Sequence, residues 1–249
     1  MVRLRKKILR NSRTTSRFYS EHSGINMGFT FSSPIKSEDR GSFSAKSVIE
    51  TPLTPFLPNS ISGGSELQPA KKLNVADHQA ILLYIVGRPG CKMNRHWGKQ
   101  LSSRLKQLKD TGIFELTNPK IVCILRPPLP DKWHIIKNFT QYVDAEMYVD
   151  SNIFDVLGES YGNICSVFTA ETIKYYNACS DVEGDNNIYS ECILSCTAVL
   201  SPDKVLYFRR EEFFGDVPPW HEISDVLTNY ELTIRQKINK EEEKECYSS

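Results

Sequence analysis

A continuous apolar run, AILLYIV at residues 80–86, constrains the fold of this chain most strongly. A run of this length without alternating polar residues is typical of a strand that is buried on both faces of a sheet. Gly90 and Cys91 follow closely, and apolar residues then recur in steps of four and three, at Met93, Trp97, Leu101, Leu105 and Leu108. That spacing forms one face of a helix. The sequence therefore predicts a central strand, a turn and a helix, with Cys91 at the point where the helix begins.

The middle of the chain continues this alternation of strands and helices. KIVCIL at 120–125 and AEMYV at 145–149 predict two further buried strands. Between them, Asp131 is placed to cap a helix, and after them Asp150 opens a short helix that ends at Gly158. Strands separated by helices predict right-handed crossovers and parallel pairing.

The C-terminal part follows a different pattern. ECILSCTAVL at 191–200 and KVLYFRR at 204–210 are strands separated only by SPD, which predicts an antiparallel hairpin. A last helix is expected to begin near Pro219, with a buried face formed by Ile223, Val226, Leu227 and Tyr230. Parallel units followed by a hairpin and a terminal helix predict an α/β protein with a thioredoxin-like fold, a central mixed sheet with flanking helices.

Composition divides the chain into three parts. Residues 1–76 are rich in Ser, Thr and Pro without a sustained period, so we expect a disordered, basic N-terminal arm. Residues 77–232 form the expected domain, and residues 233–249 a charged C-terminal tail. The first 20 residues hold seven Lys and Arg and no acid, and RFYS at 17–20 resembles a matrix-processing site. A mitochondrial presequence and a regulatory basic arm both fit this segment.

Charge and cysteine usage narrow the function classes. Beyond residue 20 the chain carries 24 basic against 30 acidic residues, which argues against a nucleic-acid-binding core. No apolar stretch reaches the roughly 18 residues of a membrane span. Seven unevenly spaced cysteines, several of them in apolar runs, favour an intracellular protein with reduced thiols, in the cytoplasm or the mitochondrion.

Three segments in order resemble the peroxiredoxin-like proteins of the alkyl hydroperoxide reductase/thiol-specific antioxidant (AhpC/TSA) type. The first is the strand that leads into Gly90-Cys91 at a helix start, the second YVDSNIFDVLG at 148–158, and the third VLYFRREEFFGD at 205–216. The resemblance extends over residues 80–227. The resemblance implies a thioredoxin-like fold, antioxidant or oxidoreductase activity through a single helix-N-terminal cysteine, and an external thiol reductant such as thioredoxin or glutathione.

The chain also departs from that family. Many members carry a C-x-x-C motif at the helix start, whereas this chain reads Cys91-Lys92-Met93-Asn94 and lacks the second cysteine. Arg88 stands where a peroxidase of the family has a Thr or Ser. The alternative is therefore a non-catalytic thioredoxin-like scaffold that has lost its redox cysteine pair.

Cys91 is the candidate catalytic residue. Unpaired backbone N–H groups and the helix dipole stabilise a thiolate at a helix N-terminus. Arg88, Lys92 and Arg95 are within one turn and are expected to support the thiolate, and His96 is placed to assist from the next turn. The alternative is a structural cysteine that merely fits the turn.

The remaining cysteines are expected to be structural, with one open question. Cys123, Cys192 and Cys196 lie in predicted strands, so burial is the expected role. Cys165 and Cys179 fall in the irregular stretch 159–187, from which either could reach an oxidised Cys91, and Cys246 is expected to be exposed. Metal-ligand spacings, a Gly-rich phosphate loop and a dinucleotide motif are all absent from the sequence, so neither a metal nor a cofactor is expected. Glu211, Glu212 and Asp216 are expected at a turn before the last helix.

Overall fold

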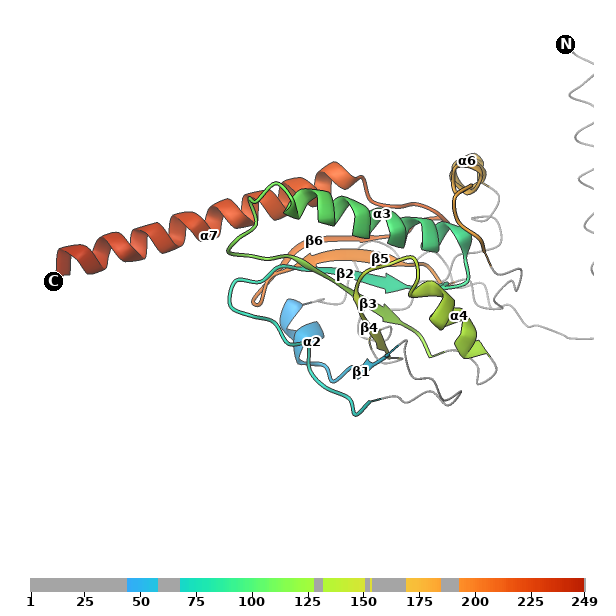
Figure 1. Cartoon of the computed structure of the whole chain (residues 1–249), viewed down its shortest axis with the longest axis horizontal. Coiled ribbons are helices and arrows are strands. Elements are labelled where there is room, and N and C mark those ends of the chain that lie inside the picture. The colour runs from blue at the N-terminus through green and yellow to red at the C-terminus, as the bar shows by residue number, and fades with distance from the viewer. Residues whose placement is uncertain are drawn as a thin grey trace, which may run out of the picture. The chain divides into compact units, whose positions relative to one another are not determined.

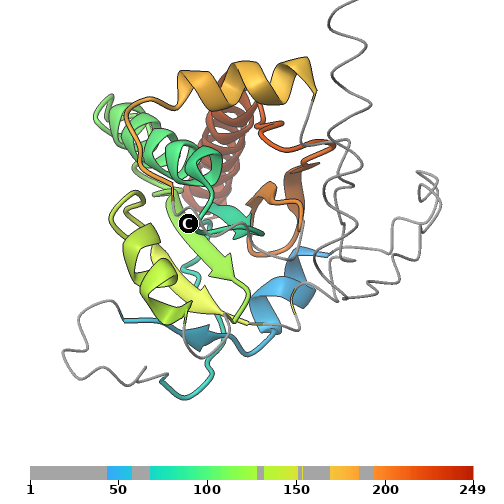
Figure 2. The same cartoon turned by 90° about the vertical axis from the view of Figure 1, so that its right-hand side faces the viewer.

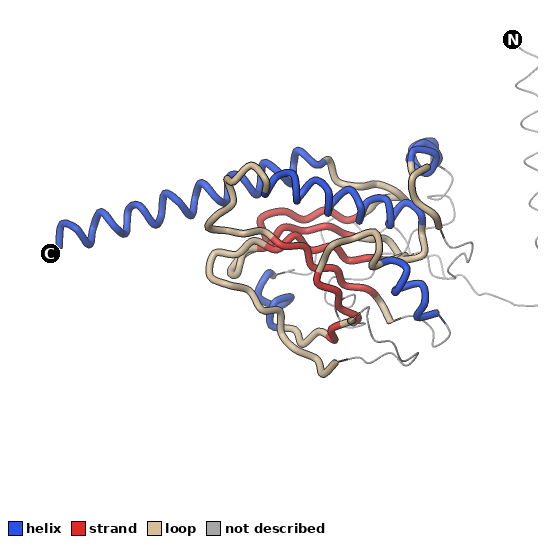
Figure 3. The backbone as a smooth tube through the Cα atoms, in the orientation of Figure 1, coloured by secondary structure: helices blue, strands red, loops and turns tan. Residues whose placement is uncertain are grey.

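The computed structural model describes residues 44–57, 68–127, 132–150, 153, 169–184 and 193–248. All of them belong to one compact unit, Gly41–Ser249. Six strands among these residues form one mixed sheet in the order β1-β4-β3-β2-β5-β6 (Figures 1 and 3). Their bounds are Thr54–Pro55 for β1, Ile81–Val86 for β2, Lys120–Leu125 for β3, Glu146–Val149 for β4, Cys196–Leu200 for β5 and Val205–Arg210 for β6.

The strand directions confirm the expected topology. β2 lies at the centre, with β3 parallel on one side and β5 antiparallel on the other. β4 extends the parallel half beyond β3, and β6 completes the antiparallel hairpin with β5. A parallel crossover unit, a hairpin and a terminal helix around a central strand make a thioredoxin-like fold.

Helices cover both faces of the sheet (Figure 1). One face packs against α3 (Lys92–Lys109), α4 (Trp133–Phe139) and the first turns of α7 (Trp220–Ser248). The other face packs against α2 (Ala45–Glu50). The sequence of β2 is continuously apolar because both of its faces are buried. Leu82 and Tyr84 belong to the core on the α3 face (the first core), and Leu83 belongs to the core on the α2 face (the second core). A further helix, α6 (Ala170–Ala178), lies near the N-terminal end of α3.

Several helices and strands begin at other residues than predicted. α4 begins after Lys132, and Asp131 is outside the described residues. Asp150 accepts a 3.0 Å hydrogen bond from the backbone N–H of Ile153, as an N-cap does, while the rest of the expected helix to Gly158 is outside the described residues. β5 begins only at Cys196 rather than near residue 191.

The folded domain extends beyond the expected limits at both ends. Val48 and Leu53 are fully buried against the second face of the sheet, and Leu73 is 4% exposed there. Part of the expected arm therefore belongs to the domain. Its few apolar residues complete the second core, although the segment has no sustained apolar period that would predict this. At the other end, the expected charged tail is the continuation of α7, with Ile234 buried in the first core.

Candidate functional site

Cys91 is the N-cap residue of α3, as predicted. Its carbonyl accepts the first helical hydrogen bond from the Arg95 N–H at 3.1 Å, and its own N–H donates to the Arg88 carbonyl at 2.9 Å. The thiol makes no capping hydrogen bond, and the residue is half-buried. Cys91 thus lies at the positive end of the helix dipole and is partly exposed.

Arg88 is buried and paired with a carboxylate. Its Nη2 donates to Glu211 Oε2 at 2.8 Å, and its guanidinium carbon lies 3.7 Å from the centre of the Phe214 ring. Its Nε is buried and has no hydrogen-bond partner among the residues that the structure describes. This places Arg88 within the domain interior, where its charge is balanced by Glu211.

Arg95 holds two backbone segments together. It is 2% exposed, and it donates from Nε to the Pro89 carbonyl at 3.0 Å and from Nη1 to the Glu183 carbonyl at 2.8 Å. It therefore joins the turn before Cys91 to the segment after α6.

Lys92 and His96 face α6 and the segment that follows it. Lys92 Nζ lies 4.8 Å from the centre of the Tyr176 ring. His96 Nδ1 is 2.7 Å from Asp181 Oδ1, and its Nε2 is 2.6 Å from the Gln100 amide nitrogen. Both ring nitrogens of His96 are thus engaged away from Cys91. The hydrogen bond from Lys99, followed by that from His96, lowers the pKa of Asp181 to about 2.

The structure separates the cysteines into classes. Cys123 and Cys196 are buried in β3 and β5, where burial raises the pKa of both thiols, that of Cys196 to about 12. Their predicted structural role agrees with these positions. Cys246 is exposed on α7. Cys165 and Cys192 are outside the described residues.

Cys179 lies in the same apolar cluster as Cys91. It follows the last residue of α6 and is fully buried with Met93, Leu194 and Phe214, and Cys91 and Tyr175 pack against this group. The sequence offered no local pattern that fixes Cys179 in place, because the contacts come from segments distant in the chain.

A buried hydrogen-bond network behind Cys91 was not recognised from the sequence. Ser195 Oγ accepts from Asn94 Nδ2 at 2.8 Å and from the Gly87 N–H at 3.2 Å, and the Ser195 N–H donates to Glu211 Oε2 at 2.8 Å. Burial raises the pKa of the Glu211 carboxyl, and Arg88 opposes that shift. Arg88 and Glu211 are 123 positions apart, so no local spacing could have indicated the pair.

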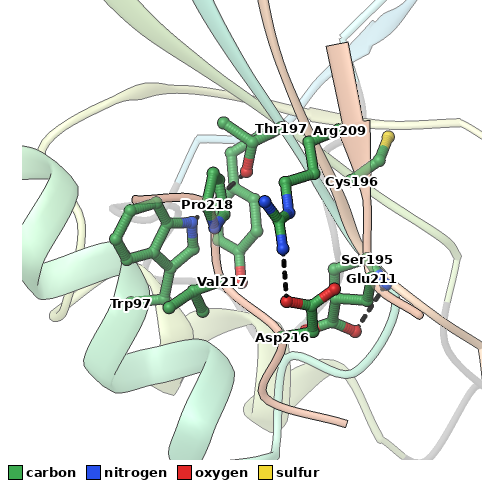
Figure 4. A pocket seen from close by; sticks show the side chains of 10 residues that line it. Trp97, Ser195, Cys196, Thr197, Arg209, Glu211, Asp216, Val217 and Pro218 are labelled. Carbon is green, nitrogen blue, oxygen red and sulfur yellow. Dashed lines mark hydrogen bonds and ion pairs between the residues drawn. The ribbon is translucent and has the colours of Figure 1, made fainter. Parts of the chain in front are cut away.

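Figure 4 shows a small cavity beside this network, between the N-terminal part of α3 and the β5–β6 hairpin. Arg209 Nη2 donates to Asp216 Oδ1 at 2.8 Å there, and Trp97 Nε1 donates to Thr197 Oγ1 at 3.3 Å. Its volume of about 10 Å³ is enough for a single water molecule. The cavity thus has no room for an organic substrate in this conformation.

Tyr175 enters the interior next to the cysteine cluster. A Cβ on Gly215 would lie 2.7 Å from the Tyr175 ring, and Gly215 has a φ of 85°, so only glycine fits there. The Tyr175 hydroxyl is buried, and no described residue forms a hydrogen bond with it. Burial raises its pKa, and the nearby thiols of Cys179 and Cys91 and the Glu211 carboxylate add to that shift.

The described residues contain no group of three or more His, Cys, Asp and Glu side chains that could hold a metal ion. Among the same residues, no helix is long and apolar enough to cross a membrane.

Comparison with known proteins gives a distant likeness of fold. No protein-family model matches the chain, and no curated protein matches it significantly in sequence. Among solved structures, the bacterioferritin comigratory protein of Xanthomonas campestris, studied for alkyl peroxide reduction, is 16% identical with a TM-score of 0.38, over 75% of this chain and 94% of that one. A cysteine-to-serine variant of peroxiredoxin Q from the same organism is 16% identical with a TM-score of 0.38, over 75% of this chain and 93% of that one. A similar variant of PrxQ from Xylella fastidiosa is 19% identical with a TM-score of 0.42, over 74% of this chain and 91% of that one.

Proposed function

We propose that this protein is a thiol-dependent oxidoreductase of the peroxiredoxin-like type, with Cys91 as its nucleophile. The observation that carries the proposal is the position of Cys91, a partly exposed residue at the N-cap of α3 whose thiol makes no capping hydrogen bond. A thiolate at such a position is stabilised by the helix dipole and by unpaired N–H groups of the first turn.

The proposed reaction balances with a hydroperoxide as oxidant. The Cys91 thiolate attacks one peroxide oxygen, the O–O bond breaks, and the other oxygen leaves as an alcohol or water after taking up a proton. Cys91 becomes a sulfenic acid. An external thiol, such as thioredoxin or glutathione, supplies the two electrons that restore it.

A second candidate function is a non-catalytic binding scaffold. One observation favours it: Arg88 and Arg95, two of the three cations expected to support the thiolate, are bound to Glu211 and to backbone carbonyls. Their side chains thus have structural partners of their own, and the fold alone does not determine the function.

The decisive experiment follows peroxide consumption by the full chain in the presence of a thiol reductant. We expect Cys91→Ser to reduce consumption to background, because a serine hydroxyl forms no comparable nucleophile near neutral pH. Cys246→Ser is the matched control, since that thiol is exposed and remote in the sequence from α3. Equal consumption by wild type and Cys91→Ser would support the scaffold. The pH dependence of Cys91 alkylation adds an independent measure of its thiolate.

We also propose an intracellular site of action, in the cytoplasm or the mitochondrion. The mitochondrial alternative depends on the first 20 residues, which are outside the described residues. A fusion of residues 1–25 to a fluorescent protein tests the mitochondrial alternative, and a diffuse cytosolic or nuclear signal would exclude it.

A further inference from the structure

We infer that Cys179 is the resolving thiol of this protein and forms a reversible disulfide with Cys91. The inference rests on the proposed function in that Cys91 must first be oxidised. It assigns the second redox cysteine to the segment after α6, although the helix that carries Cys91 has no C-x-x-C motif.

The first support is proximity inside one apolar cluster. Cys179 is a buried member of the cluster against which Cys91 packs, together with Met93, Leu194 and Phe214. Burial raises the pKa of the Cys179 thiol to about 12, while Lys92 lowers it and Cys91 raises it. Cys91 thus packs against the cluster that holds Cys179, and a charge on Cys91 disfavours ionisation of the Cys179 thiol.

The second support is a set of contacts that fixes the segment after α6 to the start of α3. Asp181 accepts from Lys99 Nζ at 2.7 Å and lies 2.7 Å from His96 Nδ1, and the Glu183 carbonyl accepts from Arg95. A Cβ at position 184 would lie 3.3 Å from the Lys92 backbone nitrogen, so Gly184 permits this close approach. In Figure 2, which shows α3 from its N-terminal end, α6 lies across that end and the chain then descends beside it. The backbone segments that carry Cys91 and Cys179 are therefore held next to each other before any disulfide forms.

The third support is the small amount of structure that Cys179 must give up. It is the C-cap residue of α6, and among the described residues its thiol donates only to the Tyr175 carbonyl, at 3.1 Å. A thiol is a weak hydrogen-bond donor, and helix ends open more easily than helix interiors. Turning the Cys179 side chain toward Cys91 therefore leaves the sheet and α3 intact.

The electrostatics change in the right direction during the reaction. While Cys91 is a thiolate, its negative charge disfavours ionisation of Cys179. Conversion of Cys91 to a neutral sulfenic acid removes this effect, whereas Lys92 still favours the Cys179 thiolate. The Cys179 sulfur then attacks the Cys91 sulfur, the S–S bond forms, and the hydroxyl leaves as water with the proton from Cys179.

The test oxidises the full chain in two separate arms, with equimolar hydrogen peroxide and with diamide, and maps disulfides without reduction. Trypsin leaves Cys179, Cys192 and Cys196 on one peptide, because no Lys or Arg lies between Lys174 and Lys204. A second digestion after glutamate cuts at Glu183 and separates Cys179 from the other two. We expect a peptide that links Cys91 to Cys179 in both arms.

Variants supply the second readout. Cys179→Ser and Cys179→Ala should lose the linked peptide and accumulate dimedone-reactive Cys91 after peroxide treatment. Cys196→Ser, which changes another buried cysteine of the same tryptic peptide, should retain the link. A disulfide between Cys91 and any other cysteine, or none in either arm, would overturn the inference. A Cys91–Cys179 link with diamide but no reaction with peroxide would refute the proposed peroxide chemistry and leave the thiol pair supported.

Discussion

Two buried glutamates, one near each end of α3, have pKa values that their surroundings shift in opposite directions. Glu211 lies behind Cys91 at the N-terminal end, and Glu231 binds the loop that follows the C-terminal end. The pKa of Glu211 is raised above its ordinary value, with burial as the main cause, whereas that of Glu231 is lowered. The Glu211 carboxylate therefore takes up a proton more readily than an ordinary glutamate, and the Glu231 carboxylate less readily.

Glu231 is satisfied by four hydrogen bonds. Its carboxylate accepts from the backbone N–H groups of Leu116 and Thr117, from the Thr117 hydroxyl at 2.7 Å and from Arg235 Nε at 3.0 Å. These bonds overcome the effect of burial on its pKa. Glu231 thus fastens the loop after α3 to α7.

The surroundings of Glu211 are less complete. Arg88 and the Ser195 N–H donate to its carboxylate, yet burial still dominates its pKa. Two buried groups nearby, Arg88 Nε and the Tyr175 hydroxyl, have no hydrogen-bond partner among the described residues. The polar groups at the Cys91 end are therefore not optimised for stability alone, which is common at functional sites.

Removal of the Glu211 carboxylate is expected to have the largest effect on stability. Glu211→Ala leaves the buried Arg88 guanidinium without its counter-charge, and we expect a loss of about 3–5 kcal/mol in the free energy of unfolding. Urea denaturation monitored by tryptophan fluorescence measures it. Glu212→Ala is the matched control. The Glu212 side chain is exposed, so its removal should change the free energy of unfolding by less than about 0.5 kcal/mol. Equal losses in the two variants would refute the importance of the pair.

Removal of Glu231 should cost somewhat less and should leave the thiol untouched. Glu231→Ala leaves the buried Thr117 N–H and hydroxyl unpaired, with an expected loss of about 2–3 kcal/mol. The rate of Cys91 alkylation should remain that of wild type, since Glu231 is attached to the opposite end of α3. Glu241→Ala, at an exposed position of the same helix, serves as control. A slower alkylation in Glu231→Ala would show that the two ends are coupled.

The pH dependence of stability should distinguish the two glutamates by sign. The folded-state pKa of Glu231 lies below its ordinary value of 4.5, so its contribution is present above that pH and is lost as the pH falls through the folded-state pKa. The folded-state pKa of Glu211 lies above 4.5, so its contribution is present at low pH and is lost as the pH rises through that pKa.

Glu231→Gln and Glu211→Gln make this difference measurable. Each unit of pKa shift corresponds to about 1.4 kcal/mol. As the pH rises from 4, the stability of wild type relative to Glu231→Gln should increase, whereas its stability relative to Glu211→Gln should decrease. Chemical denaturation at several pH values gives both difference curves. Parallel curves would contradict the assigned directions.

The sequence was sufficient for most of the sheet because local patterns define its strands. The continuous apolar runs at 80–86 and 120–125 gave two central strands within one residue of their observed bounds. The position of Cys91 at the start of α3 followed from the spacing of Met93, Trp97 and Leu101 in the same way. Each of these features depends only on neighbours in the chain.

The features that the sequence did not reveal depend on partners distant in the chain. Arg88 pairs with Glu211, and Cys91 packs against the cluster that contains Cys179, because α6 and the hairpin pack against the start of α3. Leu53 and Leu73 are buried for a similar reason, since they cover the outer face of a sheet whose strands lie elsewhere in the chain. The expectation that Arg88 and Arg95 simply supply charge to the thiol overlooked these structural partners.

Substitution of Lys92 should produce the smallest effect and tests the remaining cation. Lys92 is half-buried, and its ammonium lies over the Tyr176 ring, so water screens its charge only in part. We expect Lys92→Met to slow Cys91 alkylation at neutral pH by about threefold, because the thiolate is the reactive form and one partly screened charge shifts its fraction modestly. Stability should change by less than about 1 kcal/mol, the range of an exposed cation–π contact. Lys106→Met, at an exposed position further along α3, should leave the rate unchanged. If the two variants alkylate equally fast, Lys92 does not stabilise the Cys91 thiolate. The N-terminus of α3 then remains as the source of that stabilisation.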